Sequence, residues 1–506
     1  MSYKELALPD FNELLDLPDA QRKRVMRISS APAENEVEKY IFRLFAYAVA
    51  NKASDLHFTA RDYGAGIEVL VNARLKGGLA TWRYQGAHPK HFEEKLFNLS
   101  NIGSGTHGES ISSSFRMNFP VEWAAQYGLV SEDENYLIDV RVQYQTTADG
   151  YTTVCRILDS QRAPKLEDLG LSVALYSEIT KVLKRPSGLI LVTGPTGSGK
   201  STLMNAMIHY LNDGSRSIVT IEDPKEYTIK GHTSITQIAV RGRLTFAEGL
   251  RSAMRLDPDV IMIGEIRDEE TMEIALKASQ TGHMVISTVH ADDAVGAFTR
   301  CLDLCPDKSR DATRIANCVK LVIAQRLLDT YEGTTETRNL SLYEKELLTS
   351  NGVLSSDHLL ETTGIEHTGK IPVIEAIRMD YDIMREICSP KVEPEKIFRL
   401  AAKQLQYESQ MLGGFRHVEA GKCRLDQCEK DLHSNPYAKS NPPLRTVLAK
   451  QYDVPYLTVA KAIDEVYTLS QANINTTVDD VLHSYQAFTK TIDTEREKNA
   501  VLSAVA

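Results

Sequence analysis

Hydrophobic and polar positions follow different periodicities in successive parts of the chain. From Gly188 onward, short apolar runs alternate with stretches that have apolar residues at helical spacing. Such alternation predicts a mainly parallel sheet covered by helices, which binds ligands at the carboxyl ends of its strands. The predicted strands of this part are Leu189–Thr193, Ser217–Glu222, Val260–Gly264 and Met284–Thr288, with helices starting at Lys200 and Glu269.

The part before residue 159 has a different pattern, in which strand-like runs follow one apolar helical stretch. This pattern predicts an α+β domain. Its strands are expected at Asp55–Thr59, Gly66–Val71, Tyr136–Tyr144 and Thr152–Leu158, with a Gly/Ser loop at 103–114.

Polar stretches predict the domain boundaries. We expect an N-terminal extension (1–36), an α+β domain (37–158), a linker (159–168), an α/β domain (169–432) and a helical tail (433–506) that begins with a second linker, 433–443. A polar insert is expected at 332–370. The apolar faces of the tail helices either close the domain or dock on a neighbouring subunit or a partner.

Composition narrows the function classes. The chain has 506 residues, of which 42% are hydrophobic and 25% charged, and a formal charge of -10. These values are typical of globular domains and argue against non-specific nucleic-acid binding. The 7 irregularly spaced cysteines indicate reduced thiols in a cytosolic protein. No apolar signal core opens the sequence, and no run of ~18 apolar residues could span a membrane.

One segment has the spacing of a phosphate-binding loop. Gly194-Pro195-Thr196-Gly197-Ser198-Gly199-Lys200-Ser201, followed by Thr202, fits G-x-x-x-x-G-K-[ST] between an apolar strand and an amphipathic helix. The glycines allow successive N–H groups to point at phosphate oxygens, and the helix N-terminus favours negative charge. Lys200 is expected to contact the β- and γ-phosphates of ATP, and Ser201 to bind Mg²⁺.

Three further strands end in polar residues that could act on a bound nucleotide. Glu222, Glu265 and His290 each lie at the carboxyl end of a predicted strand. A carboxylate can orient the attacking water and a histidine can sense the γ-phosphate. Because Gly264 precedes Glu265, where many ATPases have an acidic pair, Glu265 alone is expected to activate water.

Together these segments resemble the secretion ATPase superfamily, the motors of type II secretion and type IV pili. The resembling blocks are Ala53–His57, Thr220–Pro224, Phe246–Asp268, Thr281–His290 and Ala324–Leu327. The resemblance covers roughly residues 37–430, and its blocks follow the family's order.

The resemblance implies a fold and a function. The fold is α/β: a RecA-like P-loop ATPase core with a mainly parallel sheet, preceded by a PAS-like α+β domain and followed by a helical C-terminal region. The function is that of an ATP-hydrolysing homohexamer at the cytoplasmic face of the inner membrane. It would associate with the membrane through an inner-membrane platform protein and power assembly of a type IV pilus or secretion pseudopilus. A retraction motor of the same family is the alternative.

The resemblance also implies residue roles. Lys200 and Ser201 bind ATP and Mg²⁺, Glu265 is the catalytic carboxylate, and Glu222 and His290 line the site.

Arg141 and Arg156 match positions at which the family has sensing arginines. The turn-forming Ala148–Gly150 lies between them, so a hairpin would bring them onto one sheet. We expect both to close over the γ-phosphate, in the same subunit or in a neighbouring one.

Some features depart from the family. No cysteine lies between Cys318 and Cys388, so the four-cysteine zinc site of many assembly motors is not expected. The pairs Cys301 with Cys305 and Cys423 with Cys428 are expected to be core thiols.

Two other function classes remain open. One is a nucleic-acid-dependent RecA-like ATPase, against which the acidic composition argues. The other is a scaffold that binds ATP without hydrolysing it, against which Glu265 and His290 argue.

Overall fold

The computed structural model describes residues 41–49 in part, 53–62, 67–75, 78–84, 110–120, 135–158 and 165–486, the last with short gaps around 224–234, 241–243, 354–357, 364–365, 435–436, 453–455 and 473–474. The chain divides into two compact units, Met1–Ala163 with Glu226–Ile229, and Pro164–Lys225 with Lys230–Ala506. Of the predicted linker 159–168, only residues 165–168 are described. The predicted extension 1–36 lies outside the described residues.

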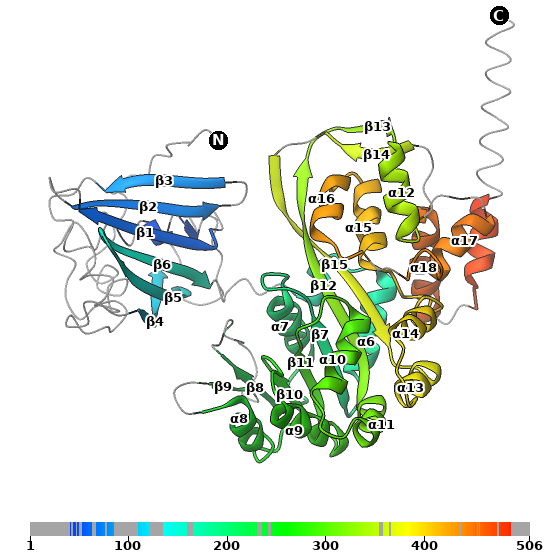
Figure 1. The fold of residues 1–506 in the computed structure, drawn as a ribbon, viewed down its shortest axis with the longest axis horizontal. Coiled ribbons are helices and arrows are strands. Elements are labelled where there is room, and N and C mark those ends of the chain that lie inside the picture. The colour runs from blue at the N-terminus through cyan, green and yellow to red at the C-terminus, as the bar shows by residue number, and fades with distance from the viewer. Residues whose placement is uncertain are drawn as a thin grey trace, which may run out of the picture. The chain divides into compact units, whose positions relative to one another are not determined.

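In the described part of unit 1, six strands form one antiparallel sheet in the order β3-β2-β1-β6-β5-β4 (Figure 1). Alternate side chains such as Leu56, Phe58 and Ala60 are buried, which accounts for the period of two in the sequence. The strands are β1 (Asp55–Asp62), β2 (Ile67–Leu75), β3 (Gly78–Tyr84), β4 (Ile111–Pro120), β5 (Asn135–Thr147) and β6 (Gly150–Leu158).

The expected loop at 103–114 is wrong at its end, because residues 111–114 begin β4. Ser112 and Ser114 pair with Gln143 and Arg141 of β5, so the backbone pairing of a long antiparallel ladder outweighs the loop-forming composition. Residues 103–109 lie outside the described part of the chain.

The described part of unit 2 contains a seven-stranded sheet in the order β15-β12-β7-β11-β10-β8-β9. The strands are parallel except β15, which runs antiparallel to β12. The strands are β7 (Gly188–Thr193), β8 (Ile218–Glu222), β9 (Ile235–Ala239), β10 (Val260–Ile263), β11 (Met284–Thr288), β12 (Val319–Glu332) and β15 (Glu366–Arg378). The central strands are continuous apolar runs because both faces of the sheet are covered.

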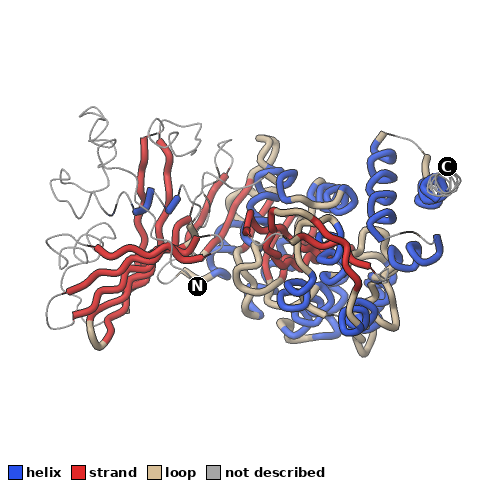
Figure 2. Tube along the Cα trace, turned by 90° about the horizontal axis from the view of Figure 1, so that it is seen from above, coloured by secondary structure: helices blue, strands red, loops and turns tan. Residues whose placement is uncertain are grey.

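Helices surround this sheet (Figure 2). Several begin where a side chain caps the first turn: Ser172 caps α6, Asp268 caps α9 and Asp293 caps α10. The elements are η2 (Leu166–Leu169), α6 (Val173–Leu183), α7 (Lys200–Leu211), α8 (Phe246–Ala253), α9 (Glu269–Gln280), α10 (Ala294–Asp303), α11 (Lys308–Cys318), α13 (Tyr381–Ile387), α14 (Pro394–Ala401), α15 (Gln410–Glu419) and α16 (Leu425–Asp431).

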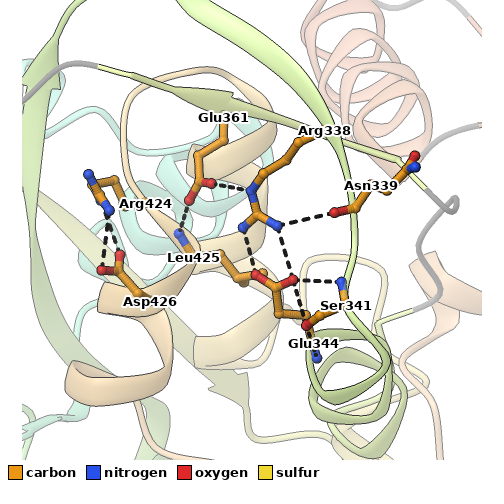
Figure 3. A network of polar contacts seen from close by, with 8 residues as sticks. All are labelled: Arg338, Asn339, Ser341, Glu344, Glu361, Arg424, Leu425 and Asp426. Atoms are coloured by element: carbon orange, nitrogen blue, oxygen red, sulfur yellow. Dashed lines mark hydrogen bonds and ion pairs between the residues drawn. The ribbon is translucent and has the colours of Figure 1, made fainter.

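The polar insert predicted at 332–370 folds around a small sheet and packs against α15 and α16. It contains the two-stranded sheet of β13 (Thr335–Asn339) and β14 (His358–Thr362), with α12 (Leu342–Ser350) between them. Arg338 joins these elements, because its guanidinium contacts Glu344 at 2.6 Å and Glu361 at 2.8 Å (Figure 3). Glu361 also accepts a hydrogen bond from the backbone N–H of Leu425, which ties the insert to α16.

The described part of the helical tail packs on the rest of unit 2. The helices α17 (Leu444–Tyr452) and α18 (Tyr456–Gln471) share an apolar cluster with Ala174 of α6. Asp464 of α18 accepts a hydrogen bond from the backbone N–H of Ala174 at 3.0 Å, and the buried Arg445 donates to the carbonyl of Leu405 at 2.9 Å. The described part of the tail thus closes the domain, the first of the two expected roles.

The described residues of the expected linker 433–443 are also fixed to the rest of unit 2. Ala438 is fully buried and belongs to the main apolar cluster of the sheet and its helices, and the N–H of His433 donates to Gln410, the first residue of α15. Its Asn, Ser and Pro composition is typical of a loop and does not reveal these long-range contacts.

Candidate active site

The loop between β7 and α7 fits tightly against β12. A Cβ atom at Gly194 would lie 2.3 Å from the carbonyl oxygen of Gln325, and one at Gly199 would lie 2.6 Å from its side-chain nitrogen. Both glycines also have positive φ angles, 139° and 86°. A Cβ at Gly197, by contrast, would meet no atom within 4 Å. The loop therefore has one closely packed side and one open side, and its glycines fit the backbone curl that phosphate binding requires.

Gln325 holds this loop from a neighbouring strand, a role that sequence reasoning did not assign. Its Nε2 donates to the carbonyl of Ser198 at 2.8 Å, across a separation of 127 residues. The Ser198 hydroxyl is buried beside it without a hydrogen-bond partner among the described atoms. The only sequence signal was that Gln325 lies in the block Ala324–Leu327.

Lys200 begins α7 and folds back over the loop. Its Nζ donates to the carbonyl oxygens of Gly194 and Pro195, both at 2.8 Å. Ser201 and Thr202 follow in the first turn of α7 and are partly exposed, as are Pro195 and Lys200, whereas Thr196 is exposed. The N-terminal end of a helix and a cation thus lie at one place, an arrangement that suits a polyphosphate.

Backbone hydrogen bonds join the ends of the neighbouring strands. The N–H of Gly264 donates to Ile221 at 2.7 Å, that of Ile266 to Thr288 at 2.9 Å, and that of Val289 to Val192 at 3.1 Å. The structure therefore brings the ends of β7, β11, β10 and β8 together at one edge, as the sequence predicts for a parallel sheet.

Glu265 and His290 meet at this edge. Nε2 of His290 lies 2.6 Å from one carboxylate oxygen of Glu265, and Nε of Arg267 donates to the other at 2.6 Å. The Glu265 side chain is 12% exposed, whereas His290 and Arg267 are 57% and 60% exposed. The carboxylate is thus fixed at both oxygens. The contact with Arg267 is one that sequence reasoning missed.

Glu222 lies at the end of the adjacent strand β8. It is buried and accepts hydrogen bonds from Thr220 at 2.7 Å and from Gln237 of β9 at 3.2 Å. It is therefore oriented by its own strand and by the next one.

Arg141 and Arg156 belong to unit 1. The register of β5 and β6 places them directly opposite each other, and the turn that joins the strands includes Ala148 and Asp149. Arg156 is exposed and donates through Nε to Asp55 of β1 at 3.1 Å. The two arginines are thus neighbours on one sheet, as the predicted hairpin requires.

The cysteines are mostly buried thiols. All seven are described and none is in a disulfide; Cys155, Cys301, Cys305, Cys318, Cys423 and Cys428 are buried, and Cys388 is exposed. Burial raises the pKa of Cys301 to about 12 and that of Cys305 to about 11, so both remain protonated thiols. Among the described residues, no group of three or more His, Cys, Asp and Glu side chains could hold a metal ion.

None of the helices that the structure describes combines the length and the apolar character needed to cross a membrane.

Comparison with known proteins gives consistent results. The family described as type II/IV secretion system protein matches residues 129–430. The type II secretion system protein E of Aeromonas hydrophila is 43% identical over 325 residues, 64% of this chain and 58% of that protein. The type II secretion system ATPase E of Vibrio cholerae is 44% identical over 212 residues, 40% of this chain and 41% of that one. The matches thus span roughly half the length of these relatives.

Solved structures support the fold. The pilus retraction motor PilT, crystallised with bound ADP, is 26% identical with a TM-score of 0.56, over 79% of this chain and 98% of PilT. The ATPase DotB of Legionella pneumophila has the same TM-score at 20% identity, over 79% of this chain and 97% of DotB. These likenesses confirm the predicted fold class: a RecA-like core with a mainly parallel sheet, between an α+β domain and a helical C-terminal region.

Proposed function

The chain belongs to the type II/IV secretion system protein family, and on this basis we propose that it is an ATP-hydrolysing hexameric motor. It powers assembly of a type IV pilus or secretion pseudopilus through an inner-membrane platform protein. The observation that carries the proposal is the position of the Glu265 carboxylate. It is held by Arg267 and His290, at the same edge of the sheet from which the loop 194–201 follows β7.

ATP binds at the loop 194–201. Lys200 exchanges the carbonyl oxygens of Gly194 and Pro195 for phosphate oxygens, which are stronger partners for an ammonium group. The open side of the loop at Gly197 leaves space for the phosphates, and Gln325 keeps the opposite side in place. The hydroxyl of Ser201 would hold Mg²⁺, and this ion would supply positive charge to the β- and γ-phosphates.

Hydrolysis depends on Glu265 and its neighbours. The carboxylate accepts a proton from, or orients, the water that attacks the γ-phosphate. His290 contacts this carboxylate and can also sense whether a γ-phosphate is present, while Glu222, held in place by Thr220, lines the site at the adjacent strand end. Arg141 and Arg156 supply positive charge from unit 1 as the transition state forms.

We propose assembly as the direction of work, and the relatives that match support this choice. The greater identities are to type II secretion proteins, 43% and 44%, against 26% for the retraction motor PilT. The likeness to PilT over 98% of that chain keeps a retraction motor as the second candidate. We place the protein at the cytoplasmic face of the inner membrane, held there by the platform protein and without direct nucleic-acid binding.

The test compares wild-type protein with Lys200→Ala and Glu265→Gln. Lys200→Ala should lose tight ATP binding, because the cation facing the phosphates is removed, whereas Glu265→Gln should bind ATP normally and lose most turnover. ATP binding is measured by titration and turnover by phosphate release. Near-normal affinity in Lys200→Ala, or substantial turnover in Glu265→Gln, contradicts the assignment, and many-fold stimulation by single-stranded DNA favours a nucleic-acid-driven enzyme.

A further inference from the structure

The loop that carries His290 is attached to the sheet on one side. Its next residue, Ala291, exchanges two hydrogen bonds with the Thr193 hydroxyl at the end of β7, at 2.7 and 2.8 Å. These bonds fix the loop next to the phosphate-binding segment. These two bonds do not involve the following residues, Asp292 and Asp293, which have other contacts.

Residues from the C-terminal part of unit 2 hold the other side. Gln410, the buried first residue of α15, donates from Nε2 to the carbonyl of Asp292 at 3.0 Å. Nε2 of His433, just beyond α16, lies 3.3 Å from the Asp293 carboxylate. The N–H of His433 in turn donates to Oε1 of Gln410 at 3.1 Å. Two residues joined to each other thus contact two consecutive residues of the loop.

Charges around the loop make the His433 contact important. Asp293 caps α10 through a 2.6 Å hydrogen bond from Gly296. Burial alone would raise the pKa of Asp293, but hydrogen bonds from His433 and Gly296 outweigh burial and lower it. The nearby carboxyl of Glu375 is fully buried, and burial together with the charge of Asp293 raises its pKa to about 8. Glu375 is therefore largely neutral at pH 7, and Asp293 is the charged carboxylate that faces His433.

The counter-charge to Asp293 comes from His433. Its hydrogen bond to Asp293 raises the pKa of His433 above the usual 6.5, with Asp292 adding to this effect and Arg326 opposing it. Arg326 lies 3.5 Å from Asp292. The ion pair between His433 and Asp293 is thus complete below the raised pKa of His433, and it is lost as the pH rises through that pKa.

We propose that Gln410 and His433 are positioning residues for ATP hydrolysis, which hold the loop 290–293 so that His290 meets the carboxylate of Glu265. This inference rests on the proposed ATPase function of the same site. It gives the C-terminal part of unit 2 a direct influence on turnover, because any movement of the segment after α16 moves the loop that carries His290.

The main experiment measures kcat and nucleotide affinity in His433→Ala. Because a displaced reacting group can cost up to about 100-fold, we expect a kcat roughly tenfold below wild type, with the Kd for a fluorescent ATP analogue changed by less than about twofold. His433 is only half-buried, so the variant should fold; its melting temperature is the check. Lys439→Ala, which removes an exposed cation from the same segment, is the matched control and should keep wild-type kcat.

The pH profile separates positioning from a merely structural role. Wild-type kcat should fall as the pH rises through the raised pKa of His433, because Asp293 then loses its counter-charge. His433→Lys keeps a positive charge to about pH 10 and should shift this fall to much higher pH while restoring kcat above that of His433→Ala. The His290 side chain is common to both proteins, so the difference between the profiles belongs to residue 433.

A double-mutant cycle gives a second, independent readout. Asp293→Asn keeps an oxygen for the Gly296 N–H but removes the charge that His433 contacts. If the pair acts together, His433→Ala should lower kcat far less in the Asp293→Asn background than in wild type.

Wild-type turnover combined with unchanged kcat in His433→Ala overturns the inference and leaves the proposed function intact. The inference is also overturned if a raised Kd for ATP accounts for all of the lost turnover in His433→Ala. It is overturned as well if the effects of His433→Ala and Asp293→Asn on kcat are strictly additive. Absence of ATP hydrolysis in the wild type overturns both the inference and the proposed function.

Discussion

The residues of the candidate site differ in how well their roles can be predicted from the sequence. The loop 194–201 is a local motif, so its glycines, Lys200 and Ser201 could be identified from spacing alone. The role of Gln325 could not, because its bond to Ser198 joins residues 127 positions apart. Arg267 lies within the block Phe246–Asp268 around Glu265, yet only the structure shows its side chain turned back onto that carboxylate.

Replacement of Gln325 by alanine should weaken ATP binding. The carbonyl of Ser198 loses its donor and the loop loses contacts on its closely packed side, at a cost of about 1–3 kcal/mol. We expect the Kd for ATP, measured by titration calorimetry, to rise about tenfold. Gln280→Ala, at the exposed end of α9, is the control. Equal affinity in the two variants would mean that Gln325 does not shape the loop.

At the scale of elements, the apolar strands of the parallel sheet were the most predictable. Their continuous hydrophobic runs, together with the cap residues of α9, give nearly the observed bounds. From the sequence, the insert 332–370 could only be recognised as polar. Its strands β13 and β14 pair with each other although α12 separates them along the chain, and they contain few apolar residues. These strands are held by the charge network of Arg338 and by buried apolar residues of the insert, among them Leu348 and Leu359, which pack against α15. Both are long-range contacts, which a short sequence pattern does not reveal.

Replacement of Arg338 by alanine should destabilise the insert modestly. Arg338 is 40% exposed, so solvent screening limits the loss to about 1 kcal/mol in the free energy of unfolding, measured by denaturant titration. Arg385→Ala removes a more exposed arginine, 3.8 Å from Asp382, and should cost less than about 0.5 kcal/mol.

The effect of Arg338→Ala should also depend on pH. The hydrogen bond from Arg338 is the main cause that lowers the pKa of Glu344 from 4.5 to about 2. A lowered folded-state pKa stabilises the fold above pH 4.5 and loses that contribution as the pH falls toward 2. The difference between wild type and Arg338→Ala should therefore shrink over this range. A difference that stays constant from pH 7 to pH 3 would contradict the ion-pair explanation.

At the scale of the whole molecule, the periodicities on the two sides of residue 159 predicted an α+β domain followed by an α/β domain, and the family resemblance added that the latter is RecA-like. It could not show that the expected linker 433–443 is attached to the sheet. That attachment depends on His433 and Ala438, two ordinary residues in a loop-like composition.

The two arginines of unit 1 test whether that unit takes part in catalysis. The register of β5 and β6 makes them direct cross-strand neighbours. Arg141→Ala and Arg156→Ala should each lower turnover heavily, since arginine fingers contribute on the order of 10³–10⁵, while ATP binding changes less. Phosphate release at the wild-type rate in both variants would show that closure of unit 1 is not needed.

A mixing experiment determines which subunit the arginines serve. Arg156→Ala subunits are combined with Glu265→Gln subunits, each inactive alone. We expect no recovery of ATPase activity, because the family resemblance favours action within one subunit. Recovered activity would assign the arginine to a neighbouring subunit of the ring.

The distribution of the cysteines should make the folded protein react with thiol reagents at a single site. Six thiols are buried and Cys388, directly after α13, is exposed. Because burial keeps thiols protonated and out of reach, a mild alkylating dye should label the folded chain at Cys388 alone. The other thiols become reactive only when their surroundings open. The rates at which they are labelled would show how often three parts of the protein open: the main cluster of the sheet, the apolar cluster around α15 and α16, and unit 1. No mutation of the protein is needed.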